Sequence, residues 1–574
     1  MSRLLISRMK NRLERERGSQ AKPWGGRLTI ALVFPNTYFQ AMSNLGFQTV
    51  YHLLNSRDDV LCERFFLPDP VDLKEHEKTG TALFSLESQR PLADFDVVAF
   101  SISFENDYVQ LPTLFRLGRI PFYAAERGDS HPLVLCGGVC AFLNPEPLAD
   151  IMDLFAVGEG EVLLPSLLEQ LTTLELSRPE LLAALAGVAG VYVPSLYDVR
   201  YAEDGTLAAM MPQKGAPPQV RRQWVRELDN SESRTFVHTP DTAFADMSLV
   251  EISRGCSRGC RFCAAGFIYL PARERTLQAL LPQVEQGLCM HRKIGLVGAA
   301  VSDYSDIDDL NREIFERQGL VSVASLRMDS LTAEEVDALR ESGHRTLALA
   351  PEAGSQRLRD LINKGIDEGQ ILSAARLLAA GGILNLKLYF LIGLPTEEQD
   401  DIDELLQLTA KVREVWVEEQ KKSGRLGTLT LSVNPFIPKP FTPLQWAAMD
   451  GAKVLESKMK HIRAGIARMP NCEVIFESMR SALLQAFLSR GDRRMSAALP
   501  LLAKGMNLKA ACREVDLDPD FYVTRERGES ELFPWEIIDN GVRRDYLWSE
   551  YGRAVRGQLT PPCFPGCRRC GVCV

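Results

Sequence analysis

Three closely spaced cysteines in the middle of the chain place the strongest constraint on what it can fold into. They form a C-x3-C-x2-C pattern made of Cys256, Cys260 and Cys263. Three thiolates within eight residues can surround one metal centre, and their soft sulfur favours an iron–sulfur cluster or zinc. A structural zinc site takes four ligands, and the next candidates, Cys289 and His291, follow only after a predicted helix. A four-iron cluster would keep one iron open for catalysis; a zinc knuckle that lacks a ligand is the alternative.

The residues around this pattern alternate short apolar runs with amphipathic segments, which is typical of α/β folds with parallel strands. Six such repeats predict a partial TIM-type (β/α)6 barrel over residues 246–447, and the cysteines follow directly after its first strand. The six predicted strands are Leu249–Gly255, Ile294–Val301, Ser322–Leu326, Thr346–Ala350, Asn385–Leu391 and Thr428–Val433.

The same alternation fills residues 27–205, where it predicts a doubly wound, Rossmann-like domain. Its strand-like runs are Leu28–Pro35, Asp96–Ser103, His131–Gly138 and Leu154–Glu161. Ligands of such sheets bind outside the carboxyl ends of the strands. The candidate binding residues at these ends are Asn36, Gly137, Gly138, Gly158 and Gly160.

Three further segments complete the predicted organisation. Residues 1–26 form a basic arm, residues 206–245 a connector with a hairpin near Tyr201–Met211, and residues 448–574 a mostly helical region with a cysteine-rich tail. The 574 residues exceed one domain, and 45% hydrophobic with 25% charged residues indicate a folded chain. A net charge of −9 argues against binding nucleic acid or a membrane over the whole surface. Since no apolar run is long enough to span a bilayer, we expect a soluble, cytoplasmic protein.

The cysteine loop after the first barrel strand resembles the signature of the radical S-adenosylmethionine (SAM) superfamily. In that superfamily three cysteines hold a [4Fe-4S] cluster, and its open iron binds S-adenosylmethionine. An electron from the cluster cleaves S-adenosylmethionine to a 5′-deoxyadenosyl radical. The resemblance implies these cofactors and this catalytic role for Cys256, Cys260 and Cys263.

Other segments resemble the superfamily's S-adenosylmethionine-binding motifs. Phe262 is expected near the adenine, as is the backbone of Gly393 in the segment LKLYFLIGLPTE. Glu352 and Ser355, in the segment LALAPEAGSQRLRDLINKG, are expected to contact the ribose or the methionine part. Arg327, in the segment SLRMD, follows a barrel strand and is expected to pair with a carboxylate.

One superfamily motif is missing. A Gly-Gly-Glu sequence often grips the methionine amino group, but the corresponding segment GLVGAAVSDY has no glutamate, so Ser302 and Asp303 or backbone carbonyls are the alternatives. Ordinary structural explanations also exist for the motifs present. A Gly-Leu-Pro turn is a common strand exit, Glu352 could cap a surface element, and Arg327 could form a strand-end salt bridge.

A doubly wound domain ahead of such a barrel resembles the cobalamin-binding subgroup of this superfamily. The resemblance is carried by the strand-end loops Pro35–Gln48, Leu135–Asp150 and Phe155–Glu161. It implies that Asn36 and the four glycines approach a corrinoid. Domains that ligate cobalt through histidine carry D-x-H-x-x-G, which none of His52, His76 and His131 has, so histidine ligation is not expected. The alternative is a Rossmann-like domain that has lost its cofactor and presents substrate or packs on the barrel.

A second cysteine group closes the chain in a C-x3-C-x2-C-x2-C pattern, formed by Cys563, Cys567, Cys570 and Cys573. Four thiolates within eleven residues are a complete ligand set. Zinc sites usually pair two knuckles across a longer loop, whereas tight spacing is typical of iron–sulfur loops. We predict an auxiliary iron–sulfur cluster, with zinc and redox-active or disordered thiols as the alternatives.

These features predict a radical enzyme that abstracts hydrogen from an unactivated carbon and, with cobalamin bound, methylates it. One alternative is methylthiolation or another sulfur insertion on RNA or protein, with the tail cluster as sulfur source. Another is a non-enzymatic iron–sulfur maturation or electron-transfer protein. A flavodoxin or ferredoxin is the expected electron donor and a membrane is not an expected partner. The substrate stays unnamed, because a fold specifies machinery rather than substrate, and nucleic acid stays among the candidates.

Overall fold

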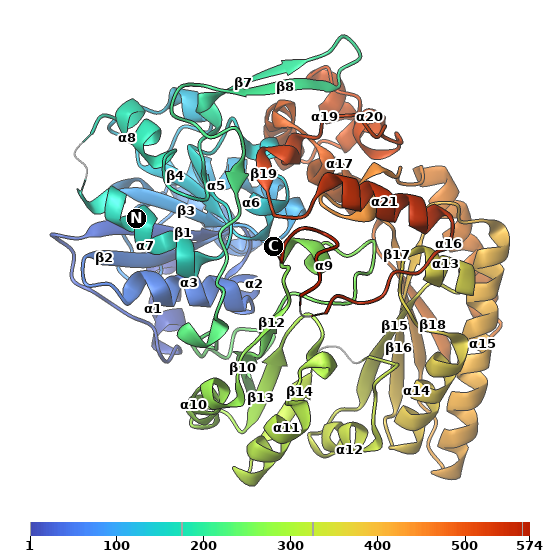
Figure 1. Cartoon of the computed structure of the whole chain (residues 1–574). Coiled ribbons are helices and arrows are strands. Elements are labelled where there is room, and N and C mark those ends of the chain that lie inside the picture. Colours follow the sequence, from blue (N-terminus) through green and yellow to red (C-terminus); the bar gives the residue numbers. More distant parts are fainter. Residues whose placement is uncertain (1, 174–175, 324–326, 565, 574) are drawn as a thin grey trace.

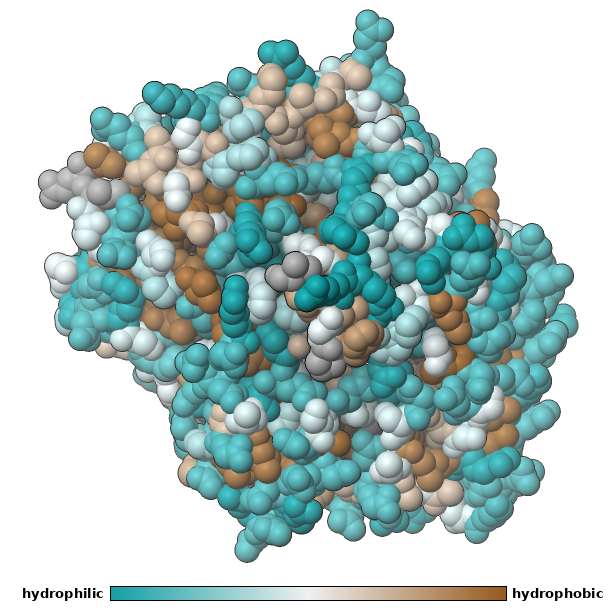
Figure 2. All heavy atoms as spheres, in the orientation of Figure 1, coloured by the Kyte–Doolittle hydropathy of each residue, from teal (hydrophilic) through white to brown (hydrophobic). Residues whose placement is uncertain are grey.

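The computed structural model describes residues 2–173, 176–323, 327–564 and 566–573. In Figure 1 the sheet domain near the N-terminus is blue to cyan, the barrel strands run from green to orange, and the last helices are red. Apolar side chains gather mainly over the sheet domain on the face shown in Figure 2, and most of that face is hydrophilic. In the part of the chain described, no helix is both long and apolar enough to cross a membrane.

A six-stranded sheet with the order β2-β1-β3-β4-β5-β6 forms the first domain. Its strands are β1 (Leu28–Phe34), β2 (Val60–Phe66), β3 (Val97–Ser101), β4 (Leu133–Gly137), β5 (Leu154–Ala156) and β6 (Val191–Tyr192). Neighbouring strands are parallel except for β6, which is antiparallel to β5. The strand order reverses between β1 and β3, and ligands of open α/β sheets bind at such a switch point.

Helices cover both faces of this sheet, which confirms the predicted doubly wound architecture. They are α1 (Arg3–Glu14), α2 (Tyr38–Met42), α3 (Leu45–Asn55), α4 (Pro70–Thr79), α5 (Leu111–Gly118), α6 (Val139–Leu143), α7 (Gly160–Thr173) and α8 (Arg178–Leu185). On one face Ile30 and Leu32 belong to the same hydrophobic cluster as residues of α3 and α7. On the other face Ala31 and Val33 share a cluster with residues of α5, because successive side chains of a strand point to opposite faces.

The barrel consists of two parallel sheets, β10-β13-β14 and β15-β16-β17-β18. Its strands are β10 (Met247–Glu251), β13 (Lys293–Val297), β14 (Leu320–Val323), β15 (Thr346–Glu352), β16 (Asn385–Ile392), β17 (Leu429–Pro435) and β18 (Cys472–Phe476). Its helices are α9 (Ala265–Ile268), α10 (Leu277–Leu288), α11 (Ile307–Glu316), α12 (Ala333–Glu341), α13 (Gln356–Leu361), α14 (Glu368–Ala380), α15 (Gln399–Lys422) and α16 (Ala452–Ile466). Parallel strands that alternate with helices confirm the barrel-type α/β architecture.

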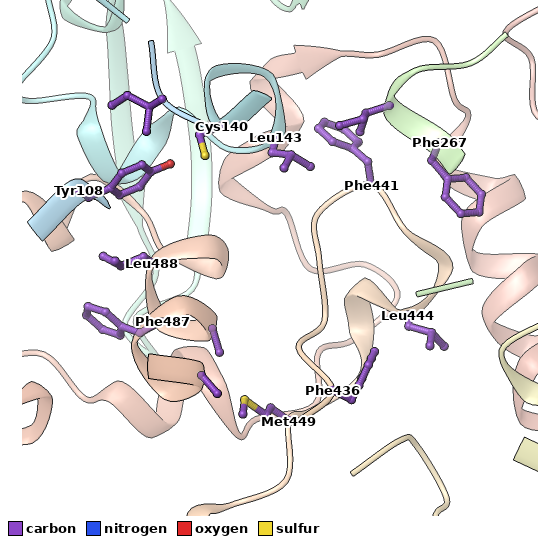
Figure 3. Close-up of a cluster of buried hydrophobic side chains, with 14 of the residues drawn as sticks. Tyr108, Cys140, Leu143, Phe267, Phe436, Phe441, Leu444, Met449, Phe487 and Leu488 are labelled. Atoms are coloured by element: carbon purple, nitrogen blue, oxygen red, sulfur yellow. The ribbon is translucent and has the colours of Figure 1, made fainter. Parts of the chain in front are cut away.

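The C-terminal region is mostly helical, as predicted, and it packs against both other parts. Its helices are α17 (Met479–Arg490), α18 (Leu499–Ala503), α19 (Leu508–Glu514), α20 (Pro519–Val523) and α21 (Arg544–Val555). Figure 3 shows Tyr108 and Cys140 of the sheet domain, Phe441 after β17, and Phe487 of α17 in one buried cluster. Because one hydrophobic core extends through all three parts, the C-terminal helices fix the sheet domain against the barrel.

Three short strand pairs complete the fold. The pairs are the hairpin β7 (Tyr197–Tyr201) with β8 (Leu207–Pro212), β9 (Val220–Arg221) with β19 (Ile538–Asp539), and β11 (Ser253–Arg254) with β12 (Arg273–Glu274). The hairpin lies where the connector predicted one, although it starts four residues earlier than Tyr201. The pairing of β9 with β19 joins the connector to the C-terminal region.

The sequence pattern did not predict three strands of the main sheets, β2, β6 and β18. In β2 the charged residues Glu63 and Arg64 interrupt the apolar run, yet Arg64 is buried between Glu16 at 2.6 Å and Glu87 at 2.7 Å. The half-exposed edge strand β18 extends the second sheet beyond the predicted barrel end at residue 447, and its continuous apolar run is only three residues long. The predicted strand Ser322–Leu326 coincides with the end of β14, and its last residues, 324–326, lie outside the described residues.

Candidate functional site

The loop that carries the C-x3-C-x2-C motif leaves the barrel at the end of β10 and is closed at its base by β11 and β12, which pair antiparallel. Gly255 begins the loop at φ +87, and a Cβ there would lie 2.5 Å from the carbonyl oxygen of Tyr269. The turn therefore requires glycine, which adopts this backbone conformation without steric penalty. The base of the loop is thus fixed one residue before Cys256.

Cys256, Cys260 and Cys263 are all half-buried free thiols on this loop. Desolvation raises the pKa of Cys260 to about 11 and also raises the pKa of Cys263. Three soft sulfur donors on one loop fit a [4Fe-4S] cluster that keeps one iron open. Within the described residues no three His, Cys, Asp or Glu side chains are arranged around the position of a single metal ion.

Arg261 directly follows the second cysteine, and its side chain is entirely buried. The guanidinium of Arg261 donates to Glu550 of α21 at 3.1 Å and to the carbonyl oxygen of Leu361 at 2.9 Å. It also reaches the segment after α21, where it donates to the carbonyl oxygen of Gln558 at 2.6 Å and to the hydroxyl of Thr560 at 3.2 Å. The C-terminal region therefore anchors the middle of the loop.

Ion pairs tie the base of the loop to the sheet domain. Arg254 of β11 lies 2.8 Å from Glu159 and 2.9 Å from Glu161. It also lies 2.7 Å from Glu251, and Arg273 of β12 lies 2.8 Å from Glu159. Desolvation would raise the pKa of Glu159, but the hydrogen bond from Arg273 and the charge of Arg254 outweigh it, so the pKa is lowered. The acidic residues of the predicted glycine loop thus hold the cysteine loop.

A second network joins the cysteine loop to the ends of β13 and β14. Arg258, between the first two cysteines, lies 2.5 Å from Asp303 and 3.3 Å from Asp329. Arg327, which was predicted to pair with a carboxylate, lies 2.8 Å from Asp329 and 3.4 Å from Asp303. Two guanidinium and two carboxylate groups therefore meet beside the cysteines. Their charges are opposite to those of the carboxylate and the amino group of an amino acid, respectively.

The predicted contacts Glu352 and Ser355 lie at the end of β15. Glu352 has φ +67 and pairs with Lys364 at 3.1 Å. Desolvation raises the pKa of Glu352, and Lys364 only partly opposes this. Ser355 is buried as the N-cap of α13, and its hydroxyl donates to Asp401 at 2.6 Å. Ser355 thus has partners within the fold, and its contact with S-adenosylmethionine stays a prediction.

The other two predicted contacts, Gly393 and Phe262, lie on different elements. Gly393 follows β16 at φ +79, and its amide donates to Glu397 at 2.8 Å. Phe262 is half-buried and packs against the large hydrophobic core. The proximity of both residues to an adenine stays a prediction.

A cavity of about 480 Å³ joins the sheet domain to the barrel. Its inner end lies between the sheet and helices α3 and α7, and its outer end reaches Arg254 and Gly255 at the start of the cysteine loop. The predicted ligand-binding glycines that line it are Gly137, Gly138, Gly158 and Gly160. Asn36 does not line it. Its side chain donates to Asp107 at 2.8 Å.

The tail cysteines lie beside the cysteine loop of the barrel. The amide of Cys563 donates to the carbonyl oxygen of Ser257 at 2.7 Å. A small cavity of about 30 Å³ is lined by Cys256 from the loop and by Cys563, Cys567 and Cys570 from the tail. The two cysteine groups, about 300 positions apart in the sequence, are therefore neighbours in space.

The tail thiols differ in exposure, since Cys567 and Cys570 are buried whereas Cys573 is exposed. Arg569 donates to the sulfur of Cys567 at 3.2 Å. Desolvation alone would raise the pKa of Cys567, but the hydrogen bonds from Arg569 outweigh it, so the pKa is lowered. This environment favours the thiolate form that a metal binds.

Two family models match the chain. The model "Radical SAM proteins, N-terminal" matches residues 46–194, and "Radical SAM superfamily" matches residues 250–409, which include the cysteine loop. The chain belongs to the radical SAM superfamily. It is a radical SAM enzyme, and the superfamily implies a [4Fe-4S] cluster and S-adenosylmethionine as cofactors. The non-enzymatic alternative is therefore set aside.

Relatives of this radical SAM enzyme include proteins that share most or part of its length. An uncharacterized protein of Methanocaldococcus jannaschii is 28% identical over 84% of this chain and 94% of its own. The ribosomal protein uS12 methylthiotransferase of Pelobacter propionicus is 22% identical over 57% of this chain and 74% of its own. An uncharacterized methyltransferase of Pyrococcus horikoshii is 22% identical over 50% of this chain, which spans only 60% of that protein.

The sequence pattern did not indicate four arginines that hold the radical SAM loop: Arg254, Arg258, Arg261 and Arg273. Three of them lie within eight residues, inside or next to the cysteine motif. That local density of arginine was a signal, because cationic side chains beside clustered thiolates need carboxylate or carbonyl partners when they are buried. Their partners could not be named without the fold.

Proposed function

We propose that this radical SAM enzyme binds cobalamin between the sheet domain and the barrel and methylates an unactivated carbon of its substrate. The observation that carries the proposal is the continuity of the large cavity. It runs from the sheet face beneath α3 and α7 to Arg254 and Gly255, next to the catalytic cysteines. A methyl donor and a radical source must both reach the substrate, and this cavity opens toward the loop that would hold the radical source.

The lining of the cavity suits a large ligand with an apolar part. Its inner end contains Leu32, Leu54 and Leu167, while Gly137 and Gly138 bring backbone to its edge at the end of β4. A Cβ at Gly137 would meet nothing within 4 Å, so the space beside this residue is open. Pockets that bind cofactors are mostly apolar with a few polar groups, as this one is. When bound, cobalamin would supply the methyl group, and these residues would bind and orient it.

Among the residues that the structure describes, the proposed cobalamin site contains no histidine ligand for the cobalt. None of the described residues that line the cavity is a histidine, and the chain lacks a D-x-H-x-x-G motif. We therefore propose that cobalamin binds here without a histidine on its cobalt, a state that favours exchange of methyl groups. Asn36 is not part of this proposal, since it does not line the cavity and its side chain donates to Asp107.

Filling the cavity tests the cobalamin proposal. We expect Gly137→Val to lower the corrinoid affinity by about tenfold or more, because the added methyl groups occupy ligand space, and to leave the iron content unchanged. The matched control is Gly128→Val, since Gly128 also has open space and an ordinary φ but lies exposed in a loop. The measurement is corrinoid and iron per chain after anaerobic reconstitution. A wild-type protein that binds no corrinoid, or a Gly137→Val protein that binds it normally, would contradict the proposal.

The residues around the catalytic loop divide the remaining tasks. Cys256, Cys260 and Cys263 would hold the [4Fe-4S] cluster, which when bound supplies the electron that cleaves S-adenosylmethionine. Arg258 and Asp303 lie beside these cysteines and pair with each other at 2.5 Å. We propose that they bind the carboxylate and the amino group of the methionine part, in place of the missing Gly-Gly-Glu motif.

A second candidate function is methylthiolation or another sulfur insertion on protein or RNA. The position of the tail supports it, because Cys563 is hydrogen-bonded to the catalytic loop. The similarity to the uS12 methylthiotransferase supports it as well. Product mass distinguishes the two candidates, since methylation adds carbon and hydrogen only, whereas methylthiolation also adds sulfur and consumes sulfide from the protein.

In either case we propose that the tail thiols of Cys563, Cys567, Cys570 and Cys573 hold an auxiliary iron–sulfur cluster. The tight spacing supports iron over zinc. Anaerobic protein with two four-iron clusters would contain about eight irons and as many sulfides per chain. About four irons together with zinc would instead assign the tail to a structural zinc site.

We also propose that the enzyme works in the cytoplasm and receives its electron from a flavodoxin or ferredoxin. All thirteen cysteines lie in the described part of the chain and are free thiols there, which supports a reducing compartment. Cleavage of S-adenosylmethionine with a reduced flavodoxin or ferredoxin as the sole reductant tests the donor. Activity with a chemical reductant but with neither protein would contradict it.

A further inference from the structure

The catalytic loop depends on a single carboxylate of the C-terminal region. Arg261 lies directly after Cys260, so a displaced Arg261 side chain would move the second and third cysteines. Its side chain is 0% exposed, and Glu550 is its only carboxylate partner within 4 Å among the described residues. Glu550 also accepts a hydrogen bond from the hydroxyl of Thr560 at 2.8 Å. Helix α21, the tail and the catalytic loop therefore meet at this one carboxylate.

The tail also follows the backbone of the loop. Asn363, just after α13, donates to the carbonyl oxygen of Gly259 at 3.2 Å and to that of Thr560 at 3.0 Å. The amide of Thr560 donates back to the Asn363 side chain at 2.9 Å. Three residues later the amide of Cys563 donates to the carbonyl oxygen of Ser257 at 2.7 Å. The tail thus bonds directly to the backbone between the first two catalytic cysteines at Ser257, and it reaches Gly259 through Asn363.

The thiols of the tail continue from this contact. Cys563, Cys567 and Cys570 line the same small cavity as Cys256 and Gly259. The main chain of Cys563 bonds to the catalytic loop, while its thiol belongs to the ligand set of the tail. After α21 the described residues of the tail contain no helix or strand. A metal centre that cross-links these thiols would therefore restrict the position of Cys563, because it removes conformational freedom that no regular structure removes.

We infer that metal binding by the tail positions the catalytic cysteine loop. Glu550, Thr560 and Asn363 are positioning residues, since they act through Arg261 and the loop backbone. The inference rests on the metal site proposed for the tail, and it is independent of cobalamin. It implies that loss of the tail metal loosens the loop that holds the first cluster, although all three of its cysteines remain.

Hydrogen–deuterium exchange of the full chain, reconstituted anaerobically with iron and sulfide, tests the inference. The first variant, Cys567→Ser with Cys570→Ser, removes two thiols of the tail and leaves every contact residue of the loop in place. We expect it to lose the tail iron and to exchange the amides of residues 255–263 about tenfold faster than wild type. We also expect the spectroscopic change of the first cluster on addition of S-adenosylmethionine to diminish.

The second variant, Glu550→Gln, breaks the contact and keeps all seven motif cysteines. We expect it to retain the tail iron, and again to exchange residues 255–263 about tenfold faster, because the charge of Arg261 loses its buried partner. The matched control is Glu531→Gln, which breaks another C-terminal ion pair, to Arg525 at 2.7 Å, and should leave the loop unchanged.

Three outcomes would overturn the inference. The first is unchanged exchange of the loop in the cysteine variant once the tail iron is gone. The second is faster exchange that extends equally through the sheet domain, which would show general unfolding rather than release of the loop. The third is a wild-type tail that holds no metal. In that last case the cleavage of S-adenosylmethionine by the wild-type protein still measures the radical function by itself.

Discussion

Ion pairs hold the catalytic loop at its base and at its middle. The two attachments differ in how many carboxylates each arginine contacts. At the base, Arg254 and Arg273 face the three carboxylates of Glu159, Glu161 and Glu251, with separations of 2.7 to 2.9 Å. The side chains of these glutamates are between 4% and 15% exposed. Arg254 contacts all three acids and therefore keeps two partners when one acid is removed, whereas Arg273 pairs with Glu159 alone.

At the middle of the loop Arg261 has one acidic partner, Glu550, whose other cation is the exposed Arg553 at 3.7 Å. Arg261 and Glu550 are 3.1 Å apart, with side chains 0% and 5% exposed. Breaking a buried pair leaves the remaining charge without compensation, which is among the largest penalties that a single substitution can impose. The comparison therefore predicts that Arg254 tolerates the loss of one acid at the base, whereas Arg261 does not tolerate the loss of Glu550 at the middle.

The largest effect is expected from the loop's own cysteines, and it sets the limit against which both attachments are judged. We predict that Cys260→Ser abolishes the reductive cleavage of S-adenosylmethionine, because the cluster loses one of its three protein ligands. Formation of 5′-deoxyadenosine under anaerobic conditions measures it. Cys289→Ser is the control, since Cys289 is exposed and lies outside both motifs. Unchanged 5′-deoxyadenosine production by Cys260→Ser would refute the cluster assignment.

The next effect concerns the middle of the loop. We predict that Arg261→Ala lowers the free energy of unfolding by about 3 kcal/mol, because the buried Glu550 loses its close partner and keeps only the exposed Arg553 at 3.7 Å. Denaturant unfolding of the anaerobic protein measures it. The double variant Arg261→Met with Glu550→Leu should recover much of that loss, since apolar side chains of similar size replace both charges. A single variant as stable as wild type would show that the pair does not hold the loop.

The sequence predicted the elements whose signals are local. The apolar runs of the first sheet and the barrel, the spacing of Cys256, Cys260 and Cys263, and the glycines at the ends of β4 and β5 depend on neighbouring residues only. Gly158 illustrates this, because its φ of +133 at the turn after β5 favours glycine.

The sequence did not predict features that depend on distant partners. Arg261 and Glu550 are 289 positions apart, and such a pair leaves no periodic pattern. Strand β2 was missed because Arg64 looks unsuited to a buried strand until Glu16 and Glu87 are placed beside it. The predicted ligand contact of Asn36 stays a prediction, and its side-chain partner Asp107, 71 positions later, could not be named from the sequence.

The attachment at the foot of the loop is expected to depend on pH, because it uses carboxylates with lowered pKa values. Desolvation would raise the pKa of Glu159 and of Glu251, but their arginine partners outweigh it and both pKa values are lowered. Their contribution to stability is therefore present above the ordinary glutamate pKa near 4.3 and is lost as the pH falls through the lowered values. We predict that Glu159→Gln lowers the free energy of unfolding by about 2 kcal/mol at pH 7, with the difference shrinking as the pH falls through the lowered pKa of Glu159. Denaturant unfolding across this range measures it, and a difference that grows on acidification would contradict it.

The smallest effect is expected from Glu161. We predict that Glu161→Gln lowers the free energy of unfolding by about 1 kcal/mol or less, because Arg254 keeps Glu159 at 2.8 Å and Glu251 at 2.7 Å. The matched variant is Glu550→Gln, which makes the same chemical change at the middle of the loop, where Arg261 has no second carboxylate within 4 Å among the described residues. Both variants are compared at pH 7 by denaturant unfolding. If Glu161→Gln destabilises the protein as much as Glu550→Gln does, the additional carboxylates around Arg254 do not compensate for the loss of one of them. The two attachments of the loop are then equivalent.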